Sequence, residues 1–228
     1  MEQLPFWIPA LFIMITIVAA WLFFKATHFN KAVLLIVVGW SLLQAGISLS
    51  GFYQNTSGIP PRFGLLLLPP LVCILILFST RKGRHLLDLL DVKTLTLLHT
   101  IRIFVELVLY GLFLHHAIPK IMTFEGRNLD ILAGLSAPVI WYFYYQRKQL
   151  NKRILLVWNL VCLGLLLNIS VTAILSSPFP FQKFGFEQPN IALGHFPYCW
   201  LPSFVVPVVL LSHLTAIRRL LLKSNAKA

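Results

Sequence analysis

Seven long apolar stretches divide this chain, and they constrain its fold more than any other feature of the sequence. They lie at residues 6–24, 32–53, 63–79, 101–118, 131–146, 154–176 and 201–217. At a rise of about 1.5 Å per residue, a helix over each stretch would cross most or all of a ~30 Å hydrocarbon core. The sequence therefore predicts an all-α integral membrane protein, built as a bundle of seven transmembrane helices.

The basic residues between these stretches alternate in density along the chain. Of the nineteen Lys and Arg residues, fourteen fall in every second connection and in the C-terminal segment. Four others, Arg62, Lys120, Arg127 and Lys183, fall in the remaining connections. Because cytoplasmic loops carry the excess of Lys and Arg, this pattern predicts an N-terminus outside and a C-terminus inside.

Composition narrows the class of protein further. With 58% hydrophobic and only 11% charged residues, the chain does not fit a soluble globular protein. A net charge of +12 would suggest nucleic acid as the partner of a soluble protein, but here it is explained by loops that anchor to anionic lipid head groups. We therefore expect the lipid bilayer as a partner and no nucleic acid. The short loops indicate one domain over residues 1–228, favour a bacterial inner membrane as the location, and leave a homo-oligomer open.

The connection between the third and fourth stretches has a pattern of its own. Residues 84–98 place several Leu side chains on one helical face, with Asp and Lys side chains elsewhere. This arrangement predicts an amphipathic helix that lies in the cytoplasmic interface and leads into the fourth span.

Two segments of the chain resemble each other. The residues of 30–35 reappear in similar form at 151–156, each as Asn-Lys followed by apolar residues. The order of this and weaker matches predicts a parallel 3+1+3 plan, in which the last three spans repeat the first three around a linking fourth.

The fourth span is the only one with charged residues in its interior, Arg102 and Glu106. They are four residues apart and so share a helical face, on which they are expected to pair. His99 and Tyr110 fall on the same face. Because charge at bilayer depth is costly, it is usually paired and turned toward the bundle interior. The sequence therefore predicts a polar site along this face.

Polar residues on other spans are candidates to complete this site: Gln44, Asn159, Asn168 and His213. The leading hypothesis is that the chain binds or translocates a small solute, an ion or a proton, without enzymatic activity and without a cofactor. Arg102 would hold an anionic group or keep Glu106 ionised, and Glu106 would carry a proton or bind a cation. The alternative for the same residues is a structural or receptor subunit, in which the charged pair only fixes helix packing.

A second hypothesis is a membrane-embedded enzyme that acts on a lipid or isoprenoid. His115, His116 and His195 are expected near the outer face, close to Glu125 and Asp130. Three imidazoles and a carboxylate could hold zinc and activate a water molecule. However, adjacent histidines on a helix point about 100° apart, which makes a shared metal awkward.

Haem is the other cofactor that the histidines suggest. His99 and His213 are expected at similar depths, where they could ligate haem iron from two sides. No spacing in the sequence requires this arrangement.

Overall fold

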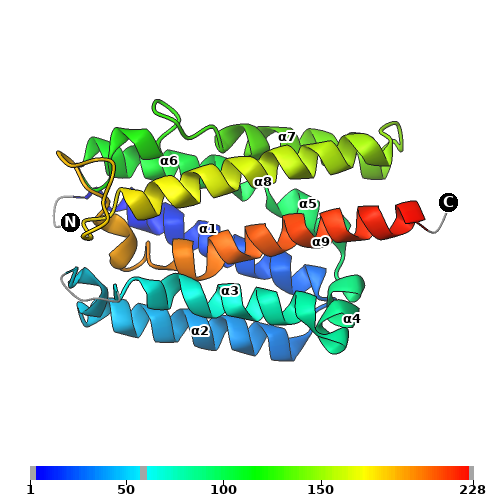
Figure 1. Ribbon diagram of the computed structural model, residues 1–228, viewed down its shortest axis with the longest axis horizontal. Helices are drawn as coiled ribbons and strands as arrows, with labels where there is room; N and C mark the ends of the chain where they lie inside the picture. Colours follow the sequence, from blue (N-terminus) through cyan, green and yellow to red (C-terminus); the bar gives the residue numbers. More distant parts are fainter. Residues whose placement is uncertain (1–3, 57–60, 226–228) are drawn as a thin grey trace.

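The computed structural model describes residues 4–56 and 61–225, whose regular structure is helical throughout (Figure 1). The α-helices are α1 (Trp7–Ala26), α2 (Lys31–Leu49), α3 (Gly64–Ser79), α4 (Arg81–Leu89), α5 (Val92–Leu98), α6 (Ile101–Leu114), α7 (Ile131–Trp141), α8 (Lys152–Leu175) and α9 (Val206–Asn225). Short 3-10 turns lie at Phe52–Gln54, Lys120–Met122 and Ala192–Gly194, and π-helical turns at Tyr142–Gln146 and Leu201–Val205. The prediction of an all-helical chain is confirmed for these residues.

Five helical stretches of the described chain are long and apolar enough to cross a membrane: Trp7–Ala26, Lys31–Leu49, Val92–Leu114, Lys152–Leu175 and Leu201–Leu222. The pair of α3 and α4, which passes the same test but is bent by 96°, would make a sixth. The remaining predicted stretch, residues 131–146, forms α7, which has 11 residues, and the five-residue π turn that follows it. The chain is therefore of the helical membrane type.

Apolar side chains cover the outside of the bundle as well as filling its inside. On α2, Leu35 is 73% exposed and Ile36 is 70% exposed. On α1, the residues that are buried follow a helical stripe through Ile8, Phe12 and Ile15, although the helix is apolar all round. A helix that is apolar on every face but packed on only one is suited to face lipid with the others.

The helices pack around α1, which runs along α6 and α5 and also contacts α2 (Figure 1). α8 runs along α9, and α7 lies against α5 and α6. In Figure 1 the polypeptide enters α1 at the left-hand end of the bundle and leaves α9 at the right-hand end. Under the predicted orientation these ends are the outer and inner faces.

The sharp turn between α3 and α4 depends on Gly83. A Cβ atom at this position would lie 2.4 Å from the carbonyl oxygen of Leu77, so only glycine lets α4 fold back this closely on α3. Thr80 caps the new helix by accepting a hydrogen bond from the backbone N–H of Gly83.

The helix predicted over residues 84–98 is in fact broken at Leu90. Asp91 starts a new helix, because its carboxylate accepts hydrogen bonds from the backbone N–H groups of Lys93 and Thr94. The second part, α5, packs against α1 and α7 and continues into α6 as one candidate span. The amphipathic part is thus confined to α4 and the turn after it.

Pro207 lies in the first turn of α9 and has no backbone N–H to donate. The carbonyl oxygen four residues earlier, that of Ser203, therefore cannot accept the usual hydrogen bond from residue 207. The indole Nε1 of Trp40 on α2 donates to this oxygen at 2.9 Å. Trp40 thereby ties α2 to the π turn before α9 and donates to a carbonyl in a buried part of the bundle.

Candidate functional site

Seven polar or charged side chains are buried together in the middle of the bundle, each no more than 5% exposed. This central polar cluster consists of His99, Arg102, Glu106, Asn128, Asp130, Asn159 and His213. They come from the α5–α6 junction, α6, the segment before α7, α8 and α9. Five parts of the chain therefore meet at this point.

Arg102 is the centre of the cluster and is ion-paired with Asp130. Its Nε donates to Oδ2 of Asp130 at 2.6 Å, and its Nη2 donates to Oδ1 of the same carboxylate. Nη2 also donates to the carbonyl oxygen of Cys162 at 3.2 Å, and Nη1 lies 3.0 Å from Nε2 of His213. The guanidinium is thus held by four hydrogen bonds in a planar, two-pronged arrangement that Lys could not make.

The hydrogen bonds of His213 define its tautomer. A guanidinium can only donate, so Nε2 of His213 accepts from Arg102. Nδ1 must then carry the proton and donate to Oδ1 of Asn159, at 2.9 Å. The Nδ2 of Asn159 donates in turn to the carbonyl oxygen of Leu155 at 2.8 Å. This side of the cluster is a neutral, fully directed chain of hydrogen bonds.

Glu106 lies on the other side of the cluster and does not pair with Arg102 as predicted. Its Oε1 accepts from Nδ2 of Asn128 at 2.5 Å, and Oδ1 of Asn128 accepts from the backbone N–H of Asp130. Oε2 of Glu106 is buried and has no hydrogen-bond partner in the part of the chain that the structure describes. The prediction of an Arg102–Glu106 pair was wrong because Asp130 reaches the guanidinium from another segment.

The segment that carries Asn128 and Asp130 lies at membrane depth. A Cβ atom on Gly134, in the first turn of α7, would lie 2.8 Å from the backbone nitrogen of Ile103. The start of α7 is therefore level with the middle of the Val92–Leu114 span, not with its outer end. Non-helical backbone at such depth is tolerated only where protein buries it or a cavity adjoins it, and it often marks binding sites.

His99 stacks on His213 with ring centroids 3.9 Å apart and planes 15° from parallel. Its Nδ1 is buried without a hydrogen-bond partner in the described chain. A bis-histidine haem would need the porphyrin between the two rings, and rings in direct stacking contact leave no space for it. The haem suggested for this pair does not fit.

Three of the predicted site residues lie elsewhere. Gln44 is buried near the end of α2, where its Oε1 accepts from the hydroxyl of Tyr53 at 2.5 Å. Tyr110 donates to Glu125 at 3.0 Å near the outer end of α6. Asn168 is exposed on α8 and donates to the carbonyl of Arg127 at 3.0 Å. The sequence placed these three residues on polar helix faces, but it did not show which other segments those faces contact.

The three outer histidines do not form the alternative zinc site. Nδ1 of His115 lies 2.8 Å from the carbonyl of Gly111, and Nδ1 of His195 lies 2.8 Å from that of Ile191. His116 faces Gln188 instead, at 3.0 Å. Over residues 4–56 and 61–225, no three His, Cys, Asp or Glu side chains form a group that could hold a metal ion. Asp130, which was expected near these histidines, lies in the central polar cluster.

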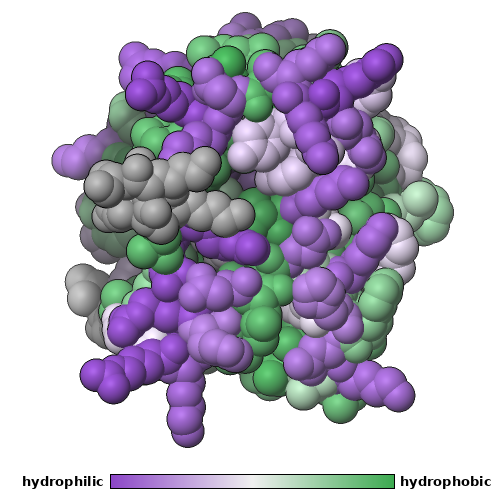
Figure 2. All heavy atoms as spheres, turned by 90° about the vertical axis from the view of Figure 1, so that its right-hand side faces the viewer, coloured by the Kyte–Doolittle hydropathy of each residue, from purple (hydrophilic) through white to green (hydrophobic). Residues whose placement is uncertain are grey.

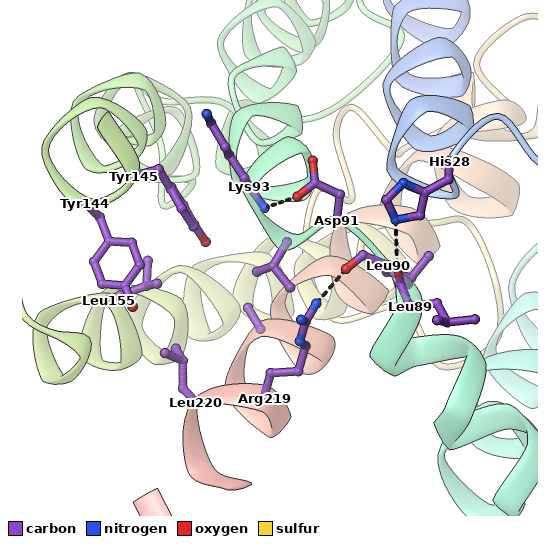
Figure 3. A pocket seen from close by; sticks show the side chains of 12 residues that line it. His28, Leu89, Leu90, Asp91, Lys93, Tyr144, Tyr145, Leu155, Arg219 and Leu220 are labelled. Atoms are coloured by element: carbon purple, nitrogen blue, oxygen red, sulfur yellow. Dashed lines mark hydrogen bonds between the residues drawn. The ribbon is translucent and has the colours of Figure 1, made fainter. Parts of the chain in front are cut away.

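A cavity of about 460 Å³ opens toward the inner end of the bundle and approaches the cluster. We call it the inner cavity. Figure 3 shows His28, Asp91, Lys93, Tyr145 and Arg219 among the side chains around it.

Two further residues that line the inner cavity, Leu155 and Ala216, connect it to the cluster. The carbonyl of Leu155 holds Asn159, and Ala216 lies three residues after His213 on α9. The cavity thus ends about one helical turn, ~5.4 Å, from the Asn159–His213 hydrogen bond.

Comparison with known proteins places the chain in a family. Residues 62–221 match the family described as "Domain of unknown function (DUF8737)", and the chain belongs to it. The matched segment begins before α3 and contains all seven residues of the central polar cluster. No curated protein and no solved structure matches the chain.

Proposed function

We propose that this member of the DUF8737 family is a seven-span protein of a bacterial inner membrane that takes up a proton at Glu106 and passes it through the central polar cluster. The proposal narrows the ligand from a small solute or ion to a proton, because all seven side chains of the central polar cluster are hydrogen-bonding or titratable groups. The alternative ligand is a monovalent cation, which carries the same charge as a proton. The test below distinguishes the two.

The main observation that supports this proposal is the number of basic and acidic groups in the cluster. The cluster contains one guanidinium, that of Arg102, and two carboxylates, those of Asp130 and Glu106. Arg102 is matched by Asp130 with two hydrogen bonds. Glu106 is therefore left without a counter-charge, and its Oε2 has no partner in the described chain. Since an uncompensated charge at bilayer depth is costly, one added positive charge at Glu106 makes the cluster neutral.

The route to the outer face follows the same side of α6. Tyr110 lies one helical turn beyond Glu106 and donates to the exposed Glu125, which pairs with Lys120 at 3.6 Å. The route to the inner face leads from His213 into the inner cavity past Leu155. Hydrogen-bonding groups therefore extend from Glu106 toward both faces.

The cluster has a division of roles in this proposal. The Arg102–Asp130 pair, with its donors and acceptors satisfied, fixes the segment before α7 against α6 and is a positioning element. Glu106 and His99, each with a buried atom that lacks a partner in the described residues, are the groups free to accept or give a proton. A purely structural cluster would not need these two free atoms.

The test is proton flux into proteoliposomes that contain a pH-sensitive dye, driven by a potassium diffusion potential. We expect Glu106→Gln to abolish the flux, because glutamine keeps the hydrogen bond to Asn128 but cannot carry a proton. The matched control is Glu187→Gln, which makes the same change at an exposed side chain that belongs to neither route and should leave the flux close to that of the wild type.

Flux in Glu106→Gln vesicles equal to that of the wild type would refute the proposal and leave the cluster a structural role. Uptake of sodium ions into the same vesicles, with no response of the pH-sensitive dye, would replace the proton by a cation. Thermal melting of each variant in detergent distinguishes lost flux from lost folding.

The proposed orientation, N-terminus outside and C-terminus inside, follows from the loop charges. It is tested by single cysteines placed at Gln54 and Gln149 in a background in which Cys73 is replaced by alanine. An impermeant maleimide added to intact cells should label position 54 and not position 149. The reverse result would invert the direction of the proposed path.

A further inference from the structure

A second cavity, of about 490 Å³, runs as an apolar groove between α2, α3 and α9. Its size falls in the range of ligand pockets, ~300–1,000 Å³. Phe23, Val37, Cys73, Leu77 and Val208 are typical of its walls. The groove lies along the membrane-facing side of helices whose outer surfaces are also apolar.

Proline residues shape this groove. Pro69 and Pro70 on α3 and Pro207 on α9 all line it. At Pro207 the carbonyl freed by the missing N–H, that of Ser203, is satisfied by Trp40, so this wall does not offer an unpaired acceptor to hydrocarbon. The walls are therefore compatible with an apolar occupant.

At its inner end the groove adjoins the inner cavity. His28, Leu89 and Leu90 line both, so the two spaces share a wall. An occupant with one apolar and one polar end could therefore lie in the groove and reach the inner cavity past this wall.

The polar end of this pair of cavities is cationic. Lys93 lies with its ammonium 5.2 Å from the ring centre of Trp141, and Arg219 donates to the carbonyl of Leu90 at 2.6 Å. Neither has a carboxylate within ion-pair distance in the described chain. The one carboxylate among the described residues that line the inner cavity is that of Asp91, which caps α5, so the lining carries two basic side chains against one acidic one.

Aromatic hydroxyls stand beside these cations, since Tyr144 and Tyr145 line the same cavity (Figure 3). Figure 2, which views this end of the molecule, shows hydrophilic side chains gathered around patches of apolar surface. Basic pockets between transmembrane helices on the cytoplasmic side are suited to anionic lipid head groups.

We propose that the groove and the inner cavity together bind one anionic phospholipid, with an acyl chain between α2, α3 and α9 and the phosphate at Lys93 and Arg219. Charge complementarity selects this occupant over a zwitterionic lipid, whose own cation would stand among the basic side chains. The groove selects it over a free anion, which would leave the apolar walls unoccupied. This site does not depend on proton uptake at Glu106.

The test uses the full chain in vesicles of phosphatidylcholine with a minor fraction of phosphatidylglycerol. The immobilised fraction of spin-labelled phosphatidylglycerol, relative to spin-labelled phosphatidylcholine, gives the selectivity. We expect Lys93→Gln/Arg219→Gln to reduce this selectivity by about thirtyfold, from the attraction of two basic residues to an anionic lipid. Lys31→Gln/Lys82→Gln, which removes two exposed charges that line neither cavity, is the matched control and should leave it within about twofold.

A groove-filling variant tests the apolar half of the site. Cys73→Trp, on the wall of the groove, should remove the immobilised phosphatidylglycerol signal although all basic residues remain. If Lys31→Gln/Lys82→Gln lowered the selectivity as much as Lys93→Gln/Arg219→Gln, the selectivity would arise from general surface charge, and the proposal would be overturned. Unchanged selectivity in Cys73→Trp would overturn it as well. Glu106→Gln should leave the selectivity intact, so this result is separable from the flux result.

Discussion

Because the Arg102–Asp130 pair is buried, breaking it should lower the free energy of unfolding more than breaking an exposed pair would. The chain offers an exposed pair for this comparison. A second bidentate arginine–aspartate pair joins Arg218 on α9 to Asp88 on α4. The side chains of the first pair are 3% and 7% exposed, whereas those of the second are 19% and 47% exposed. The effect of the same substitution, Asp→Asn, can therefore be compared between a buried ion pair and a partly exposed one.

The two variants should differ clearly in stability. Asp130→Asn removes the ion-pair partner of a buried guanidinium and weakens two charge-assisted hydrogen bonds, and breaking a buried pair in this way costs ~3–5 kcal/mol. Asp88→Asn breaks a solvent-screened pair, which typically contributes ~0.2–1 kcal/mol. We expect the free energy of unfolding to fall by at least about 2 kcal/mol more for Asp130→Asn than for Asp88→Asn.

The measurement is reversible unfolding in mixed detergent micelles, followed by circular dichroism. A double variant, Arg102→Met/Asp130→Leu, should recover most of the loss, because it removes both charges and not one. Equal losses for Asp130→Asn and Asp88→Asn, or a double variant that is less stable than Asp130→Asn, would refute the view that Arg102 is held in a dry site by Asp130.

Two smaller predictions concern helix contacts. Trp40→Phe should lower the free energy of unfolding by about 1–3 kcal/mol because it leaves a carbonyl near Pro207 without a donor; in a Pro207→Ala background, where the helix regains its own N–H, the same change should cost less. Gly134→Ala should destabilise the protein by about 1–3 kcal/mol, since its Cβ would lie 2.8 Å from backbone of α6. Gly164→Ala is the control, because no atom lies within 4 Å of the added carbon and alanine favours the helix by up to about 1 kcal/mol. Both comparisons use the same unfolding assay.

The sequence predicted the fold class well because the length of an apolar stretch depends only on residues that are adjacent in the sequence. Each of the seven apolar stretches is helical in the structure, although α7 is shorter than its stretch of the sequence. The break at Leu90 was missed, because Leu residues on both sides continue a helical pattern. The signal for it was present in Asp91, a good N-cap residue directly before Val92.

For the site, the sequence identified which residues are unusual but not which of them meet. Arg102, Glu106, Asn159 and His213 were found because polar groups stand out in apolar stretches. His99 was found because it falls on the same helical face as Glu106, and the structure brings all five together. The partner of Arg102 was missed because it lies outside those stretches. Asn128 was missed for the same reason. Their segment resembled an outer loop, and only its long-range packing against α6 carries it to membrane depth.

Because the two cavities share a wall, the proposed proton entry would depend on the proposed lipid binding. A proton that enters the inner cavity approaches the charges of Lys93 and Arg219, which repel it unless an anion neutralises them. A bound phospholipid phosphate would supply that anion. Proton flux should therefore be faster in vesicles that contain phosphatidylglycerol than in pure phosphatidylcholine, and Lys93→Gln/Arg219→Gln should give the same flux in both. If the variant keeps the lipid dependence of the wild type, the effect arises from the membrane surface and not from the inner cavity.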